Sequence, residues 1–92
     1  MRVEGNTIIF KSTVNNYFKE FMGIKPNTIR KIPSNEEAVF LEFKKNLNKD
    51  SMIQIFHVRS DGNISGYYFE RHITDISNFE GWIWIISWRH EP

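Results

Sequence analysis

The sequence predicts a small α+β domain in the order β-α-β-α-β-β-β, folded as a partly open β-barrel. Three observations support this fold class. Helical and β-rich patterns alternate in the first half, residues 52–88 form the pattern of a β-meander, and 92 residues suit one hydrophobic core. Such a meander must bury its aromatic rings under helices or by closure against the N-terminal strands, and a small barrel does both. We therefore expect a single domain over residues 1–92.

The N-terminal part predicts a strand followed by a helix. Residues 7–10 are β-rich, and Ser12 is a plausible N-cap for a helix over residues 13–22. Gly23 stands where helices commonly stop in the left-handed conformation, and Pro26 cannot continue the helix. Residues at the spacing of one helical face are expected to be buried: Val14, Phe18, Phe21 and Met22.

A second strand and a second helix follow. Residues 27–32 allow a strand in which Thr28 and Arg30 share one face. Ser34 and Glu37 have the spacing of a capping box, which predicts the start of a helix. The apolar stripe of this helix is expected to comprise Val39, Phe40, Phe43 and Leu47.

The C-terminal part predicts three strands over residues 52–59, 64–76 and 82–88. Asp61 and Gly62 give the clearest turn signal of the chain, between the first two strands. Alternation places four apolar residues on one face of the last strand: Trp82, Trp84, Ile86 and Trp88. We expect this face to belong mainly to the core, and any exposed indole to mark a surface for a protein or a single-stranded nucleic acid.

Composition excludes several classes of protein. Twelve Lys and Arg against eleven Asp and Glu give a net charge of +1, so nucleic-acid binding would have to be local. The chain has no cysteine, which removes disulfides and thiolate metal sites. Its longest apolar run, residues 82–86, is far below the roughly 20 residues that span a bilayer. We expect a cytoplasmic protein that does not enter the membrane.

The most informative segment is Gly-Ile-Lys-Pro-Asn-Thr-Ile-Arg at residues 23–30. It resembles the signature of ASCH domains in the PUA-like β-barrel superfamily: Gly, any residue, Lys, two residues, Glu or Thr, any residue, Arg. Four positions match in identity and placement: Gly23, Lys25, Thr28 and Arg30. Residues 70–88 also resemble the closing strands of these domains. The resemblance implies a PUA-like, partly open barrel with a pocket at its mouth, in a superfamily associated with RNA, nucleotides and modified nucleosides.

The residues of this segment suit such a pocket. Arg30 offers a planar fork to a phosphate or a base edge, and Lys25 offers a point charge on a flexible stem. Thr28 adds a hydroxyl on the face of Arg30, and Lys31 adds a further charge in a stretch without acidic residues. We predict a module that binds RNA, a nucleotide or a modified nucleoside through Lys25, Thr28, Arg30 and Lys31.

A hydrolase is the first alternative. Some small ASCH proteins are amidohydrolases that act on acylated nucleosides, and the resemblance then implies Lys25 as base and the Thr28 hydroxyl as its target. The motif assigns no acid, although Glu70 and Glu42 are candidates by proximity in the predicted topology. Either carboxylate is equally a candidate for a plain structural ion pair with Arg30.

A small interaction or inhibitor protein, of viral or phage type, is the second alternative. Such a protein would act through an exposed aromatic surface that includes Trp82, Trp84 and Trp88. It would need no pocket at Lys25.

Neither a metal nor a cofactor is expected. His57, His72 and His90 fall on separate strands or on the tail, without the pair spacing of metal ligands. The sequence also lacks a Gly-rich phosphate loop and a nucleophile elbow.

Overall fold

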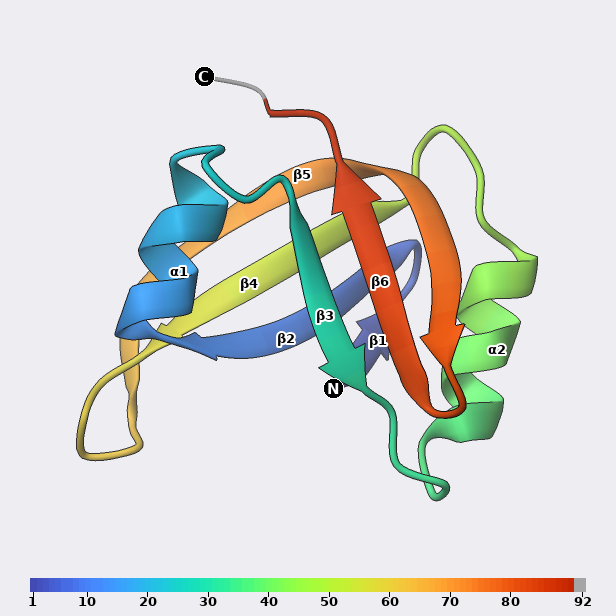
Figure 1. The fold of residues 1–92 in the computed structure, drawn as a ribbon, viewed down its shortest axis with the longest axis horizontal. Coiled ribbons are helices and arrows are strands. Elements are labelled where there is room, and N and C mark those ends of the chain that lie inside the picture. Colours follow the sequence, from blue (N-terminus) through green and yellow to red (C-terminus); the bar gives the residue numbers. More distant parts are fainter. Residues whose placement is uncertain (91–92) are drawn as a thin grey trace.

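Residues 1–90, which the computed structural model describes apart from the side chains of residues 14 and 15, form a curled six-stranded sheet with two helices (Figure 1). The strands are β1 (Arg2–Glu4), β2 (Thr7–Thr13), β3 (Asn27–Lys31), β4 (Met52–Val58), β5 (Ile64–Glu80) and β6 (Ile83–Trp88). The helices are α1 (Val14–Phe21) and α2 (Glu37–Lys45). Neither of these two helices has the length and apolar character needed to cross a membrane.

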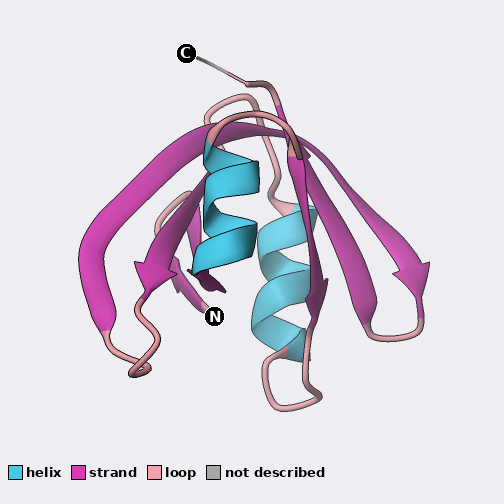
Figure 2. Cartoon of the chain, turned by 60° about the vertical axis from the view of Figure 1, so that its left-hand side comes forward, coloured by secondary structure: helices cyan, strands magenta, loops and turns pink. Residues whose placement is uncertain are grey.

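The sheet is mixed and does not close. Its strand order is β1-β2-β4-β5-β6-β3, with β2 and β4 parallel and all other neighbours antiparallel. The long strand β5 pairs first with β4 and then with β6, so it carries the sheet around a bend. Both helices lie inside the resulting arch in Figure 2. The architecture is α+β and is consistent with the predicted partly open barrel.

The curled sheet is open along one line, which we call the seam. Within the described sheet, β1 pairs only with residues 7–9 of β2, so residues 10–13 of β2 have a free edge. β3 is the last strand at the other end of the sheet order and pairs with β6. Hydrogen bonds from Arg30 on β3 to Lys11 and Ser12 on β2 show that the two edges face each other across the seam.

The predicted order of elements is confirmed, with one strand added and another lengthened. The added strand, β1, forms a tight hairpin with β2 through Gly5, whose φ is +59°. β5 continues to Glu80 rather than ending at residue 76, because its second half pairs with β6 through two register shifts. The turn at Asp61 and Gly62 forms where the sequence predicts it.

The buried face of α1 differs from the predicted face. Tyr17 and Glu20 are buried, with 5% and 1% of their surface exposed. Three residues predicted to be buried are instead 42–60% exposed: Phe18, Phe21 and Met22. The fourth, Val14, has its side chain outside the described part of the chain. On the buried face, the Glu20 carboxylate accepts a hydrogen bond from the Ser12 hydroxyl. Ser12 is not the N-cap of α1 as predicted; Thr13 holds that position, without a side-chain hydrogen bond.

The core lies between the inner face of the sheet and the two helices. On α2, Phe40 and Phe43 are buried as predicted, whereas Val39 is 51% exposed. The predicted capping box at Ser34 does not form. Residues 34–36 make a turn, so the helix begins later and Glu36 holds the N-cap without a side-chain hydrogen bond.

The three tryptophans near the C-terminus are divided between core and surface. Trp88 is 4% exposed, and Trp84 is half-buried with its ring 5.1 Å from that of Phe40. Trp82 is 56% exposed in the turn before β6. The predicted aromatic face is therefore mainly core, and Trp82 is the indole that remains largely accessible.

Candidate functional site

A network of polar side chains lies at the seam, with Arg30 at its centre. The Arg30 Nε–H donates to Thr28 Oγ1 at 2.8 Å, and Nη1 donates to the Lys11 carbonyl oxygen at 2.7 Å. Nη2 donates to the Ser12 hydroxyl. The guanidinium carbon also lies 4.8 Å from the centre of the Phe10 ring, a cation–π contact. These contacts hold the guanidinium in one position.

The network ends at the buried carboxylate of Glu20. The Ser12 hydroxyl donates to Glu20 Oε1 at 3.0 Å. Burial lowers the pKa of Arg30, and the nearby Glu20 carboxylate opposes that shift because it favours the charged guanidinium. Sequence reasoning missed Glu20, since a lone acidic residue on a short helix resembles a solvated one. The available signal was its spacing of three residues from the aromatic Tyr17, which places both on one helical face.

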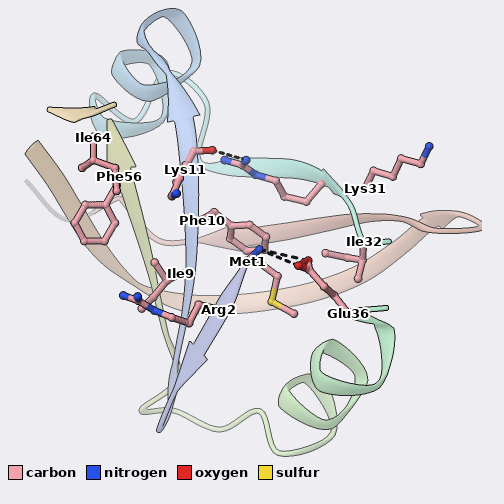
Figure 3. Close-up of a pocket in the computed structure, with 11 residues that line it drawn as sticks. Met1, Arg2, Ile9, Phe10, Lys11, Lys31, Ile32, Glu36, Phe56 and Ile64 are labelled. Atoms are coloured by element: carbon pink, nitrogen blue, oxygen red, sulfur yellow. Dashed lines mark hydrogen bonds and ion pairs between the residues drawn. The ribbon is translucent and has the colours of Figure 1, made fainter. Parts of the chain in front are cut away.

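A hollow of about 540 Å³ opens beside the network (Figure 3). Residues 9–11 of β2 and residues 30–32 around the end of β3 line it from the two sides of the seam. Phe56 and Ile64 line one end, and Met1 and Glu36 line the other. The hollow therefore combines apolar surface with a polar rim.

The charge around the hollow is mainly positive. Four cationic side chains line it: Arg2, Lys11, Arg30 and Lys31. The one lining carboxylate, that of Glu36, accepts hydrogen bonds from the Met1 amino group at 3.3 Å. Within residues 1–90 neither Lys11 nor Lys31 forms an ion pair. An anion in the hollow would meet positive charge that the described protein does not neutralise.

The structure brings together only some of the residues predicted for the site. Thr28 is 2% exposed, and its hydroxyl serves Arg30 rather than the hollow. Lys25 is half-buried after the end of α1 and does not line the hollow. Lys31 does line the hollow, although its side chain extends away from it in Figure 3. Arg30 is the predicted residue placed most directly at the hollow.

The residues considered for hydrolysis lie in different parts of the molecule. Glu70 accepts a hydrogen bond at 2.8 Å from a glutamine on the neighbouring strand. Glu42 lies on α2 and lines a second hollow of about 450 Å³. The carboxylate that belongs to the polar network is instead that of Glu20, which accepts a hydrogen bond from Ser12. Among the described residues, no three His, Cys, Asp or Glu side chains are placed to hold a metal ion.

Comparison with known proteins gives no family assignment. No protein-family model matches the chain, and no curated protein matches it either. What the site binds must therefore be inferred from its geometry and charge.

Proposed function

We propose that the protein binds RNA, a nucleotide or a modified nucleoside, with a phosphate held at the hollow on the seam. Arg30 supports this proposal most directly. A guanidinium has five N–H donors, and three of those on Arg30 are engaged by Thr28, Lys11 and Ser12. Within residues 1–90, no hydrogen bond engages the other two N–H groups of this cation, which is already fixed beside the hollow. A preorganised guanidinium loses little conformational entropy when it binds a phosphate or a base edge.

The lining of the hollow supports the same class of ligand. Lys11 and Lys31 add positive charge without a protein partner in the described chain. The half-buried ring of Phe56 adds aromatic surface, which suits a nucleobase because every base has a flat face to stack. The volume of about 540 Å³ falls within the usual range for small-molecule sites, about 300–1,000 Å³.

We also propose that the barrel is of the PUA-like kind and that residues 23–30 correspond to the ASCH signature. The segment follows α1 and opens β3, which is the placement the resemblance implies. Gly23 has a φ of +76° and ends the helix in the left-handed conformation. Lys25 does not line the hollow, and the hydroxyl of Thr28 is buried and accepts a hydrogen bond from Arg30; both facts favour a binding role over hydrolysis.

Calorimetric titration with uridine and uridine monophosphate tests the phosphate site. We compare the unmodified protein with Lys11→Ala and with Lys49→Ala, a matched control in the exposed segment between α2 and β4. We expect the monophosphate to bind more tightly than uridine. Lys11→Ala should weaken monophosphate binding about tenfold, as the loss of one charge-assisted contact of about 1.5 kcal/mol would.

Lys49→Ala should leave both affinities unchanged. Equal affinities for Lys11→Ala and Lys49→Ala would contradict a phosphate site at the seam. Failure of the unmodified protein to bind either compound would count against the nucleotide proposal as a whole.

A further inference from the structure

Three residues form a row across the outer face of the sheet, next to the hollow. Lys11 on β2 is paired in register with Phe56 on β4, and Phe56 is paired with Tyr68 on β5. Side chains at paired positions point to the same face of a sheet. Lys11, Phe56 and Tyr68 thus lie side by side, with the cation nearest the seam. We call them the outer row.

The outer row is accessible, in contrast to the row behind it. The neighbouring positions on the same three strands hold Phe10, Ile55 and Phe69, which are paired with one another in the same way. These three side chains form a parallel inner row, and each is at most 6% exposed. Tyr68 is 51% exposed, Phe56 is half-buried and Lys11 is exposed. Both helices lie on the inner side of the arch in Figure 2, so no helix covers the outer row.

The two outer rings form a pair of the kind that stacks nucleobases. Their centroids are 5.1 Å apart and their planes meet at 35°. Phe56 and Lys11 also line the hollow at the seam, so the ring pair continues directly from the proposed phosphate site. Base stacking on aromatic side chains beside a cationic groove is how proteins bind single-stranded nucleic acids without strong sequence preference.

We propose that the outer row binds a single-stranded nucleic acid, with bases stacked on Phe56 and Tyr68 and the backbone directed toward the hollow. This inference rests on the proposed function of the hollow and extends it from a mononucleotide to a strand. The charges around the outer row favour a nucleic acid as the ligand and favour a backbone directed toward the seam. Glu70 lies in the next row, bonded to Gln54, and would repel a backbone on that side, whereas Lys11 attracts it on the seam side.

The bound nucleic acid therefore crosses the sheet from Tyr68 toward β2. Adjacent strands are about 4.8 Å apart, so the path from Tyr68 to Lys11 covers about 10 Å. Two rings offer stacking positions for two bases along this path. A short oligonucleotide should consequently bind more tightly than a mononucleotide, by roughly tenfold or more.

Fluorescence anisotropy with labelled tetrauridylate, together with competition by uridine monophosphate, tests this inference. Tyr68→Leu removes the outer ring and keeps an apolar side chain. Tyr67→Leu is the matched control, since Tyr67 is the preceding residue on β5 and is 72% exposed, but lies at the irregular end of the β4–β5 pairing and outside the outer row. We expect Tyr68→Leu to weaken tetrauridylate binding about tenfold and to leave the monophosphate unchanged. Tyr67→Leu should change neither affinity.

Photocrosslinking of the unmodified protein to a tetramer containing 5-iodouracil gives a second readout that needs no variant. We expect crosslinks to peptides that contain Phe56 or Tyr68. The proposal that the outer row binds a nucleic-acid strand would be overturned if the tetramer bound no more tightly than the monophosphate, or if both tyrosine variants lost the same affinity for the tetramer. Either result would leave the phosphate site standing. Absence of binding to both ligands would overturn the phosphate site as well. A dimer that Tyr68→Leu dissociates, without oligonucleotide binding, would assign the outer row to a second copy of the chain instead.

Discussion

Arg30 shows how a single residue can serve both the fold and the proposed site. The seam brings β2 and β3 together without a strand ladder, and the guanidinium of Arg30 supplies hydrogen bonds across it. A buried charge is tolerated only when it is hydrogen-bonded or paired, and Arg30 has Thr28 and Ser12 beside it and Glu20 behind Ser12. Its two unused N–H groups are what the proposed ligand would contact.

We expect Arg30→Lys to lower the free energy of unfolding by about 2–4 kcal/mol. Lysine keeps the charge, but its single ammonium group cannot reach Thr28, Ser12 and the Lys11 carbonyl at once, so buried partners lose their hydrogen bonds. Urea denaturation measures the change. Lys31→Arg, at the exposed neighbouring position, is the control and should stay within about 0.5 kcal/mol of the unmodified protein. Equal stability of the two variants would show that guanidinium geometry does not hold the seam.

At the scale of elements, the end of α1 is the junction that positions the site segment. Gly23 adopts a φ of +76°, and the backbone N–H of Lys25 bonds the Lys19 carbonyl at 3.0 Å. This arrangement ends the helix and directs the chain into β3. His90, which follows β6, packs against the same turn: a Cβ added at Gly23 would lie 2.6 Å from its ring.

We expect Gly23→Ala to destabilise the protein by about 1–2 kcal/mol from backbone strain and by a further amount from contact with His90. Gly62→Ala is the matched control, since Gly62 also has a positive φ, +88°, but a Cβ added there would have no described atom within 4 Å. Thermal unfolding of both variants measures the difference. If contact with His90 causes Gly23→Ala to destabilise the protein more than Gly62→Ala does, replacing His90 by Ala in the Gly23→Ala variant should restore that additional stability. Equal destabilisation of the two glycine variants would exclude a role for His90.

The order of elements from β2 onward was predictable because these elements carry local signals, whereas the short strand β1 was not predicted. Gly23 and Pro26 end α1, and Asp61 and Gly62 form the hairpin turn between β4 and β5. The face of α1 was not predictable in the same way. Its apolar periodicity favours Phe18 and Phe21, yet the buried residues are Tyr17 and Glu20. The hydrogen bond from Ser12 to Glu20, eight residues along the chain, accompanies this face and has no signal in the apolar pattern.

The candidate site was predictable only in part, for a related reason. Strand alternation correctly placed Thr28 and Arg30 on one face, because that relation involves neighbouring residues. The hollow depends on the approach of β2 and β3, which are not consecutive partners in the sheet. Lys11 had no local pattern to distinguish it from a solvated lysine, although it lines the hollow and begins the outer row.

At the scale of the whole molecule, positive charge is local rather than general. The net charge is +1, yet the seam gathers Arg2, Lys11, Arg30 and Lys31 around one hollow. Arg2 also pairs with Glu4 at 3.1 Å on the exposed hairpin, which reduces its share of the field. A nucleic-acid ligand would therefore be attracted to the seam and its outer row, not to the molecule at large.

This distribution predicts a shallow salt dependence of oligonucleotide binding. Each phosphate neutralised on a single strand contributes about −0.7 to the slope of log K against log salt, so two or three contacts at the seam give a slope between about −1.4 and −2.1. Anisotropy titrations with tetrauridylate at several salt concentrations measure it. Lys11→Ala should reduce the magnitude of the slope of log K against log salt by about 0.7. Lys49→Ala should leave the slope unchanged, since Lys49 does not line the hollow. A slope steeper than about −4 would require a larger basic surface than the seam provides, and a slope near zero would show that the phosphates are not contacted.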